Sequence, residues 1–452
     1  MNERDSETIA GLLEQMGYTA VADQENADIL LINTCSVREN ADNRFFGLLG
    51  RLKHIKIQRP DVIIGVCGCM MQQEHIVEQI RDKHAWVDII FGTHNIDAIP
   101  DLIEDAKLRS KSIKKAEGPL AQILDERSGL TEGLPAKREF SYKASVNIMY
   151  GCNNFCTYCI VPYTRGREIS RDAEDIISEI KGLAATGIKE VLLLGQNVNS
   201  YSGMGNIDFA DLVTMVDSVP GAERIRFMTS HPKDLSDKLI ERFSKEGEHG
   251  AKHLCPSIHL PIQSGSTRVL EMMNRRYTKD DYIELIRKLR EVRPEIVIST
   301  DFIVGFPGET EEDFEHTMDV IERVRFDAAF TFLYSPRKGT PAADFEDTTL
   351  DEVKQSRFDR MVKRLNEITL EINKTYVGTV HDVLVEGQSK TNPDMAQGRT
   401  FGNKLVNFPP PMAYFSSRNV SPTIEDFIAM TGEIVKVRIT SVRTFSFIGE
   451  II

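Results

Sequence analysis

Three cysteines lie close together in the run Gly-Cys-Asn-Asn-Phe-Cys-Thr-Tyr-Cys-Ile, where Cys152, Cys156 and Cys159 follow a C-x3-C-x2-C spacing. Cysteine thiolates hold iron–sulfur clusters, and ferredoxin-type clusters usually take four of them. No fourth cysteine follows closely behind Cys159, so one iron would keep an open position for a substrate or a cofactor. An open position is also what makes a zinc site catalytic. We therefore predict a reactive iron–sulfur cluster on this triplet.

The spacing, followed by a long α/β chain, resembles that of the radical S-adenosylmethionine (SAM) enzymes, in which the amino and carboxylate groups of SAM chelate the open iron. A structural zinc site is the alternative. Zinc knuckles and ribbons usually pair C-x2-C units or add nearby histidines, whereas His231 and His253 lie far downstream without such spacing. The sequence favours the cluster.

Two further cysteines follow predicted strands near the N-terminus. A helical pattern opens near Asp5, and apolar strands are predicted at 29–32, 62–66 and 87–91. This alternation predicts a small parallel sheet. Cys35 follows the first strand and Cys69 the second, so if the two strands are neighbours both thiols lie outside the carboxyl edge of the sheet, where ligands bind.

The cysteine triplet follows the first of six predicted strands that alternate with helices. Six such βα units predict an open or partial barrel. Polar and glycine-rich segments follow several of these strands, at the end where a barrel collects its reactive groups. The six strands are predicted at 144–149, 190–194, 224–228, 257–260, 297–304 and 329–333.

Composition divides the chain into three parts. The helix and strand patterns dissolve after residue 106 into Lys, Glu, Ser, Gly and Pro, and short β-rich pieces follow the charged helix at 351–374. These pieces, at 381–386, 404–408, 433–439 and 446–451, predict a small antiparallel β-barrel with a surface loop at 408–430. The fold class is α/β, with a small parallel-sheet domain at 1–106, a linker at 107–137, a partial (β/α)6 barrel at 138–374 and a β-barrel at 375–452.

Length and charge limit the class of protein. A chain of 452 residues exceeds the ~250–300 residues that one core supports. The net charge of −13 argues against bulk electrostatic wrapping in nucleic acid, although local basic patches remain compatible with an RNA substrate. The seven cysteines do not have the spacing of a disulfide framework, and the sequence shows no signal pattern and no membrane-length apolar run. These features predict a soluble protein of the reducing cytoplasm.

Several longer stretches, taken with Cys35, Cys69 and the triplet, resemble the tRNA methylthiotransferases over nearly the whole chain. The family has an N-terminal methylthiotransferase domain with an auxiliary [4Fe-4S] cluster, a radical SAM domain and a C-terminal TRAM domain that binds RNA. The stretches are Leu194-Gly-Gln-Asn-Val-Asn-Ser-Tyr201, Tyr163-Thr-Arg-Gly-Arg-Glu-Ile-Ser-Arg171, His259-Leu-Pro-Ile-Gln-Ser-Gly265, Asp301-Phe-Ile-Val-Gly-Phe-Pro-Gly-Glu309, Val385-Glu-Gly387 and Gly398-Arg-Thr400.

The resemblance implies a reaction and its cofactors. A cluster on Cys152, Cys156 and Cys159 would pass one electron to SAM and release a 5′-deoxyadenosyl radical. That radical would lead to methylthiolation of carbon 2 of N(6)-isopentenyladenosine at position 37, beside the tRNA anticodon. Cys35 and Cys69 would bind the auxiliary cluster. The expected partners are tRNA and an electron donor such as flavodoxin or ferredoxin, and the chain is expected to be a monomer.

Seven further residues are candidates for binding SAM or a nucleotide. Tyr158 precedes the last cysteine of the triplet, where it either lies beside the SAM adenine or packs under the loop. Gly305 and Gly308 permit close approach of the backbone to a ligand, or simply form a turn. The others, Gln196, Asn197, Gln263 and Ser264, offer amides or a hydroxyl at strand ends, with helix capping as the alternative.

Basic residues form two candidate sites. Arg165, Arg167 and Arg171 follow the cluster loop, where they would face a phosphate or the SAM carboxylate, or form a solvated stretch. In the C-terminal barrel a surface of charge and stacking rings would bind RNA, with scattered surface charges as the alternative. Its members are Arg399, Lys404, Lys436, Arg438, Arg443, Phe401 and Phe408.

The chain departs from the family pattern at its start. The family ligates the auxiliary cluster with three N-terminal cysteines, and the first of these, with its strand, is expected to be missing from this sequence. Cys67 is not expected to replace it, because two residues before Cys69 on a strand its side chain points elsewhere or shares the face of Cys69 without reaching the same iron. The alternatives to the predicted function are methylthiolation of threonylcarbamoyl-adenosine, and an RNA-binding protein that is inactive because the auxiliary cluster is lost.

Overall fold

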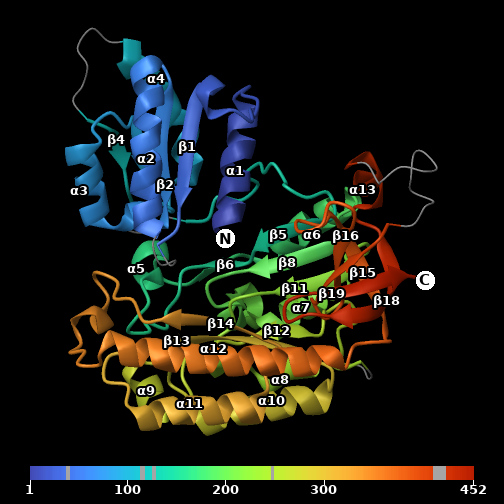
Figure 1. Ribbon diagram of the computed structural model, residues 1–452. Coiled ribbons are helices and arrows are strands. Elements are labelled where there is room, and N and C mark those ends of the chain that lie inside the picture. The colour runs from blue at the N-terminus through green and yellow to red at the C-terminus, as the bar shows by residue number, and fades with distance from the viewer. Residues whose placement is uncertain (37–40, 112–117, 125–128, 246–248, 411–423) are drawn as a thin grey trace. The chain divides into compact units, whose positions relative to one another are not determined.

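The structure is a computed structural model that describes residues 1–36, 41–111, 118–124, 129–245, 249–410 and 424–452 (Figure 1). These residues form two compact units. The first comprises Met1–Glu139, Met149–Arg171 and Arg337–Thr340, and the second comprises Phe140–Ile148, Asp172–Pro336 and Pro341–Ile452. The cysteine loop at 152–159 therefore groups with the N-terminal residues.

The first unit is built on a four-stranded parallel sheet in the order β1-β2-β3-β4, and the first three of these strands were predicted. Helices cover both of its faces, because α1 and α4 pack with Ile63 and Ile89 while α2 and α3 pack with Val66 and Ile90. Every residue of β2 is buried, as expected for a parallel strand covered on two faces. The elements are α1 (Asn2–Gln15), β1 (Ile29–Thr34), α2 (Ala41–Gln58), β2 (Ile63–Gly68), α3 (Glu74–Lys83), β3 (Ile89–Phe91), α4 (Ile99–Lys111) and β4 (Leu120–Gln122).

The segment predicted as a linker contains regular structure. Helix α4 continues to Lys111, and β4 pairs with β3 as the fourth strand of the sheet. Three residues are too few to show the alternation that identifies a strand in sequence. Residues 112–117 and 125–128 of that segment lie outside the described part of the chain.

The second unit contains the six predicted barrel strands, and the partial barrel is confirmed. They form two parallel sheets in the orders β11-β8-β5 and β12-β13-β14, joined by a bridge between Ile225 and Leu254. The strands are β5 (Lys143–Asn147), β8 (Glu190–Leu194), β11 (Arg224–Phe227), β12 (Ser257–His259), β13 (Val297–Val304) and β14 (Ala328–Leu333), and the short hairpins are β6 (Met149–Tyr150) with β7 (Ile169–Ser170) in the first unit and β9 (Ser202–Gly203) with β10 (Ile207–Asp208) in the second.

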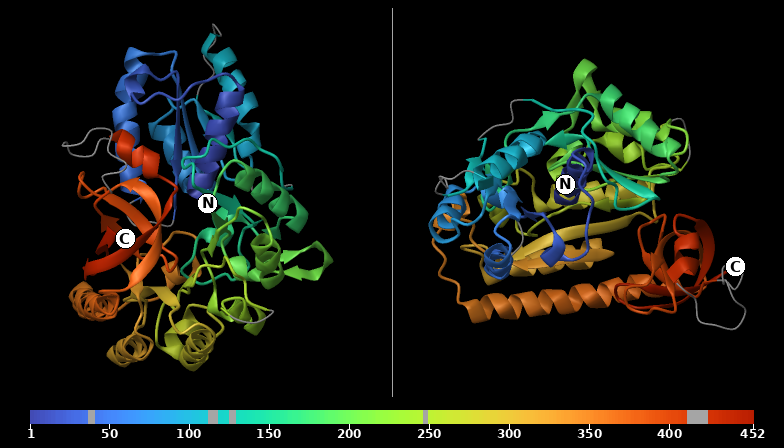
Figure 2. Two further views of the ribbon diagram at one scale, coloured as in Figure 1. Left: turned by 90° about the vertical axis from the view of Figure 1, so that its right-hand side faces the viewer. Right: turned by 90° about the horizontal axis from the view of Figure 1, so that it is seen from above.

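Helices cover one face of these sheets. Ile298, Phe302 and Val304 of β13 are fully buried on that face, and α10, α11 and α12 lie on the same side of β12–β14 in two views (Figures 1 and 2). The helices are α5 (Val161–Arg165) in the first unit and, in the second, α6 (Ala173–Ala185), α7 (Phe209–Asp217), α8 (Asp237–Glu241), α9 (Thr267–Met272), α10 (Lys279–Val292), α11 (Glu311–Val324) and α12 (Asp351–Lys374).

The C-terminal strands close a five-stranded barrel in the order β15-β16-β17-β19-β18. The prediction of a purely antiparallel barrel was wrong in one pair, because β17 and β19 run parallel. The predicted surface loop was also wrong at its end, where Ile424–Met430 forms helix α13, while 411–423 lie outside the described residues. The strands are β15 (Val380–Gln388), β16 (Ala396–Thr400), β17 (Leu405–Phe408), β18 (Ile434–Val442) and β19 (Phe447–Ile451).

Two arginines of β11 fix this barrel to the rest of the second unit. Arg224 donates to the carbonyl oxygens of Asp382 (2.9 Å) and Arg399 (2.8 Å). Arg226 donates to the carbonyl oxygens of Thr400 (3.0 Å) and Phe401 (3.1 Å). The C-terminal β-barrel is thus held at the amino ends of the strands of the partial barrel.

Candidate functional site

The backbone of the cysteine loop is fixed by contacts within the first unit. Gly151 has a φ of +74°, and a Cβ atom at this position would lie 1.9 Å from the carbonyl oxygen of Arg167, so only glycine fits. The amide of Cys152 donates to the carbonyl oxygen of Gly166 (3.1 Å), and the amide of Cys159 donates to that of Cys156 (2.9 Å). The three cysteines therefore sit on a backbone of defined shape.

Side chains reinforce this loop from its return segment. The amide of Asn153 donates to Oε1 of Glu168 (3.0 Å), and the guanidinium of Arg167 lies 4.3 Å from the ring centroid of Phe155. Phe155 itself has a positive φ of 47°, which is unusual for a residue with a side chain. The loop is held on both sides of Cys156.

The burial of the triplet suits ligation of a cluster. Cys156 is buried and the other two cysteines are half-buried. Burial raises the pKa of the Cys152 thiol to about 11, so metal binding would have to displace its proton. Among the described residues, no three His, Cys, Asp or Glu side chains converge as they would around a single metal ion. A [4Fe-4S] cluster instead spreads its thiolate ligands over several irons.

The two N-terminal cysteines are neighbours, as predicted. Thr34 of β1 is paired with Gly68 of β2, so Cys35 and Cys69 follow directly at the carboxyl edge of the sheet. Cys69 is buried, and burial raises the pKa of its thiol while the guanidinium of Arg165 lowers it. The two thiols form a second candidate cluster site.

Arg165 connects this second site to the cysteine loop. It ends helix α5, which follows Cys159, and its Nε atom lies 3.0 Å from Sγ of Cys69. Its Nη2 atom also forms an ion pair with Asp5 (2.7 Å), and both side chains are buried. A buried cation beside a thiolate is a suitable neighbour for an anionic cluster.

The remaining cysteines, Cys67 and Cys255, are buried. Cys67 packs with Ile9, Leu12 and Ile63, and burial raises the pKa of its thiol. Cys255 is also fully buried. Cys67 is thus part of the core of the first unit, whereas Cys255 lies near the charged groups of Arg226, Glu190 and Arg224.

The loop after β8 carries Gln196 and Asn197. The amide nitrogen of Asn197 donates to Oδ2 of Asp234 (2.7 Å), and the backbone of Val198 donates to Thr229 (3.0 Å). Asn197 does not cap the short 3-10 helix Val198–Ser200 that it precedes. Its buried Oδ1 atom has no hydrogen-bond partner among the described residues, and a ligand atom or water could fill that role.

The two candidate residues in the loop after β12, Gln263 and Ser264, have different surroundings. Gln263 has a φ of +75°, and its backbone bonds to Asp301 and Ile303 of β13. Ser264 is fully buried and accepts a hydrogen bond from the amide of Ser266 (3.2 Å). Ser264 thus takes part in shaping the loop, whereas the helix-capping alternative falls to Ser266, the N-cap residue of α9.

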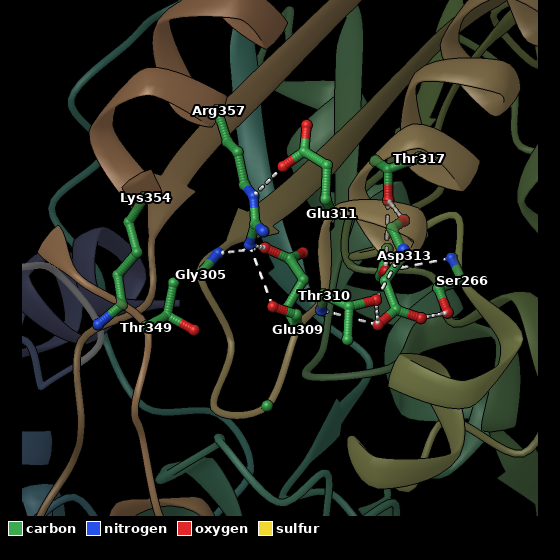
Figure 3. Close-up of polar contacts among 12 residues, drawn as sticks. Ser266, Gly305, Glu309, Thr310, Glu311, Asp313, Thr317, Thr349, Lys354 and Arg357 are labelled. Carbon is green, nitrogen blue, oxygen red and sulfur yellow. Dashed lines mark hydrogen bonds and ion pairs between the residues drawn. The ribbon is translucent and has the colours of Figure 1, made fainter. Parts of the chain in front are cut away.

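Polar contacts hold the turn after β13 (Figure 3). Gly305 and Gly308 have φ values of +73° and +79°. The amide of Gly305 donates to Oε2 of Glu309 (2.8 Å), and the Glu309 side chain is only 2% exposed. Burial raises the pKa of Glu309 to about 7. The turn is therefore closed by its own last residue.

Helix α12 supports this turn from outside. Arg357 donates from Nη1 to the carbonyl oxygen of Glu309 (3.1 Å) and from Nε to Oε2 of Glu311 (2.8 Å). The stem of Lys354 covers Gly305, since a Cβ atom there would lie 2.7 Å from Lys354 Cγ. Sequence reasoning missed Lys354 and Arg357, because they are distant from the turn in sequence and belong to an ordinary charged helix.

The predicted basic sites are only partly available to a ligand. Arg165 pairs with Asp5, and Arg171 pairs with Glu132, so the prediction that these two arginines face a phosphate or the SAM carboxylate was wrong. Arg167 is exposed and lies over Phe155.

The C-terminal barrel offers a smaller basic surface than predicted. Phe408 is fully buried in the barrel core, so its predicted stacking on RNA was wrong. Lys404 forms a buried ion pair with Asp327 (2.8 Å), and Arg399, Lys436 and Arg438 also lie near carboxylates. Arg443 is exposed, and Phe445, which sequence reasoning missed, is the most exposed ring of the described barrel residues.

Three family models match the chain. The Radical SAM superfamily matches residues 146–321, which contain the cysteine triplet. The uncharacterized protein family UPF0004 matches residues 1–92, and the TRAM domain matches residues 374–452. Among the described helices, none combines the length and apolar character needed to cross a membrane.

Curated relatives resemble the chain over its full length. A tRNA-2-methylthio-N(6)-dimethylallyladenosine synthase of Alkaliphilus oremlandii is 50% identical over 100% of this chain and 90% of its own. One of Desulforamulus reducens is 49% identical over 100% and 93%. Among solved structures, the radical S-adenosylmethionine methyltransferase TsrM from Kitasatospora setae has a TM-score of 0.53 at 13% identity, covering 86% of this chain and 76% of its own, which shows a shared fold.

Proposed function

Because this chain belongs to the tRNA methylthiotransferases, and within them to the tRNA-2-methylthio-N(6)-dimethylallyladenosine synthases, we propose that Cys152, Cys156 and Cys159 ligate its radical-generating cluster. Cys35 and Cys69 ligate the auxiliary cluster in the same proposal. The enzyme uses SAM and two [4Fe-4S] clusters. The predicted absence of a third N-terminal cysteine ligand stays a prediction.

The fixed cysteine loop is the observation that carries this proposal. Its thiols have the donor chemistry of a cluster, and the C-x3-C-x2-C spacing supplies only three ligands. When bound, such a cluster leaves one iron for SAM and supplies the electron that cleaves it. The protein residues set the position of the thiols, because Gly151 and Asn153 hold the loop backbone.

The cofactor-binding residues belong to the proposal as well. Gly305 and Gly308 would bring the backbone close to the cofactor in a turn held by Glu309, with the stem of Lys354 covering Gly305. Asn197 offers a buried carbonyl oxygen to SAM or the nucleotide. The other proposed members of this set are Tyr158, Gln196, Gln263 and Ser264.

The substrate is tRNA, and the finer statements about partners are proposals. Arg443 and Phe445 would contact RNA by charge and stacking. We also propose a flavodoxin or ferredoxin as electron donor, a monomeric enzyme in the cytoplasm, and domain limits at 1–106, 138–374 and 375–452. The modified nucleoside would be the one at position 37 of the tRNA, beside the anticodon.

Anaerobic reconstitution tests the cluster assignment. The parent chain should hold about eight irons, and Cys156→Ala should hold about four and form no 5′-deoxyadenosine. Cys255→Ala, a buried cysteine outside both sites, is the matched control and should keep both properties. Formation of 5′-deoxyadenosine by Cys156→Ala at the parental rate would refute the assignment.

Nucleoside analysis tests the substrate. A deletion strain should lose 2-methylthio-N(6)-isopentenyladenosine from its tRNA and recover it with the parent gene. Loss of methylthiolated threonylcarbamoyl-adenosine instead would favour the alternative substrate. Unchanged 2-methylthio-N(6)-isopentenyladenosine in the deletion strain would favour the RNA-binding protein without catalysis.

A further inference from the structure

Among the described residues of the second unit, helices cover only one face of the β12–β14 sheet. In β13 the residues Ile298, Thr300, Phe302 and Val304 are buried on the helix side, so the alternate residues point to the opposite face. The register of β13 with β12 and β14 then shows which residues lie beside these outward-facing residues. His259 is paired with Ser299, Asp301 with Phe330, and Ile303 with Phe332, and paired residues of parallel strands share a face.

Four of these side chains form a connected cluster. Nδ1 of His259 lies 3.0 Å from Oγ of Ser299, and its Nε2 lies 3.4 Å from Oδ1 of Asp301. The ring of His259 also meets the edge of Phe330, with centroids 5.8 Å apart. The contacts place a carboxylate, an imidazole and an aromatic ring side by side on one wall of the partial barrel.

The two phenylalanines of β14 are exposed in a way that needs an explanation. Phe330 is 55% exposed and Phe332 is 48% exposed, although both lie on a strand paired along its whole length with β13. Large rings in such a place usually contact a ligand or another surface. The same strands end at the loops of Gln263 and Gly305, so the exposed face continues from the proposed cofactor site.

The ionisable side chains of this wall are the carboxylate of Asp301 and the imidazole of His259 that contacts it. Its members on β12–β14 include the carboxylate of Asp301 and contain no lysine or arginine. Arg226, which reaches Ser257 at the lower end of β12, forms a buried ion pair with Glu190 (2.8 Å). A ligand part that carries a carboxylate would meet no unpaired cation on this wall.

We propose that Phe330, Phe332 and Asp301 form the subsite that recognises the N(6)-prenylated adenine of the substrate. The inference rests on the proposed function and names the residues that select its substrate. The rings contact the purine and its apolar tail, and the Asp301 carboxylate accepts the remaining N(6)–H. His259 is a positioning residue, because it holds Asp301 through Nε2.

This wall also explains a choice between two modified adenosines. An isopentenyl tail is apolar and uncharged, so it gains from contact with the phenylalanines. A threonylcarbamoyl tail ends in a carboxylate, which would be placed near Asp301 and away from any cation. The subsite therefore selects the first tail by attraction and rejects the second by repulsion.

Binding of anticodon stem-loop RNAs tests the subsite. Three RNAs, identical except for adenosine, N(6)-isopentenyladenosine or threonylcarbamoyl-adenosine at the target position, would be bound to the reconstituted enzyme. The parent should prefer the isopentenyl RNA to the unmodified one. Phe330→Ala and Phe332→Ala should each reduce that preference about tenfold. Asp301→Asn should reduce the ratio of the affinity for the isopentenyl RNA to the affinity for the threonylcarbamoyl RNA.

Phe445→Ala provides the contrast. This exposed ring lies in the C-terminal barrel, so its loss should weaken the binding of all three RNAs equally and leave the ratios of their affinities unchanged. Each variant should retain parental SAM binding, which shows that the partial barrel is intact. Ratios that stay parental in both Phe330→Ala and Phe332→Ala would overturn the subsite. Failure of the parent to methylthiolate the isopentenyl RNA would instead refute the proposed function.

Discussion

The Nε atom of Arg165 lies 3.0 Å from Sγ of Cys69, although the two residues are 96 positions apart in the sequence. Arg165 ends the helix that follows Cys159, while Cys69 follows the second strand of the N-terminal sheet. The same guanidinium holds Asp5. One buried cation thus connects the two proposed cluster sites through the protein.

Replacing Arg165 by methionine should destabilise the first unit and the auxiliary cluster together. Asp5 would remain as a buried carboxylate without its cation, which costs about 3–5 kcal/mol. Removal of the positive charge should also weaken binding of the anionic cluster. Thermal unfolding would measure the first effect, and a fall from about eight irons toward about four would measure the second.

The double variant Arg165→Met with Asp5→Asn separates these effects. It removes the unpaired charge, so stability should recover while the iron content stays low. Full iron content in the double variant would mean that Arg165 serves the fold and has no part in holding the auxiliary cluster.

Local patterns predicted much of the fold. The strands β8 and β13 have the predicted limits, since β8 is a short apolar run after Glu190 and β13 has apolar residues at both of its ends. Cys35 and Cys69 were placed together because parallel neighbouring strands end at one edge. Strand β16 was missed, because Gly398 and Arg399 give it no apolar alternation.

The residues that hold the site were harder to predict. Arg357 supports Glu309 across 48 positions, and such a pair between distant charged side chains leaves no periodic trace in the sequence. Phe408 was misplaced on the surface because alternation does not say which side of a closed barrel faces inward. Motifs therefore identified the candidate loops, and only the three-dimensional contacts identified their supports.

Arg357→Met should impair SAM binding through the Gly305 turn. The loss frees the carbonyl oxygen of Glu309 and removes the cation near its buried carboxylate, so the turn loses its fixed shape. The KM for SAM should rise about tenfold, a cost typical of unsatisfied buried groups. Titration with SAM and steady-state formation of 5′-deoxyadenosine would measure this.

Arg360→Met is the matched control for that variant. Arg360 lies on the same helix and also pairs with Glu311, but it does not contact Glu309. Its removal should leave the KM for SAM unchanged, and Arg357→Lys should restore part of the affinity by keeping the charge. An equal change in Arg357→Met and Arg360→Met would contradict a specific role in positioning the turn.

The raised pKa of Glu309 should make stability depend on pH. Burial raises this pKa from 4.5 to about 7 in the folded protein. Between these values the folded state holds a proton that the unfolded state releases, so stability falls as pH rises and levels off above pH 7. The loss should amount to roughly 3 kcal/mol.

Comparison with Glu309→Gln isolates this carboxyl group. Glutamine does not titrate, so the stability of the parent relative to the variant should fall between pH 5 and pH 8. Denaturant unfolding at the two pH values would measure the difference. A constant difference would show that the Glu309 carboxyl has an ordinary pKa.

Arg226→Met should loosen the C-terminal barrel from the partial barrel. Its guanidinium pairs with Glu190 and donates to the carbonyl oxygens of Thr400 and Phe401. Removal leaves a buried carboxylate without a cation, at a cost of about 3–5 kcal/mol, whereas Lys436→Met breaks an exposed pair worth less than about 1 kcal/mol. Limited proteolysis should release a C-terminal fragment from the first variant and not from the second.

The double variant Arg226→Met with Glu190→Gln separates stability from docking. Its stability should recover, while proteolysis should still release the C-terminal fragment because the two carbonyl contacts are lost. Resistance of that double variant to proteolysis would assign the docking to Arg224.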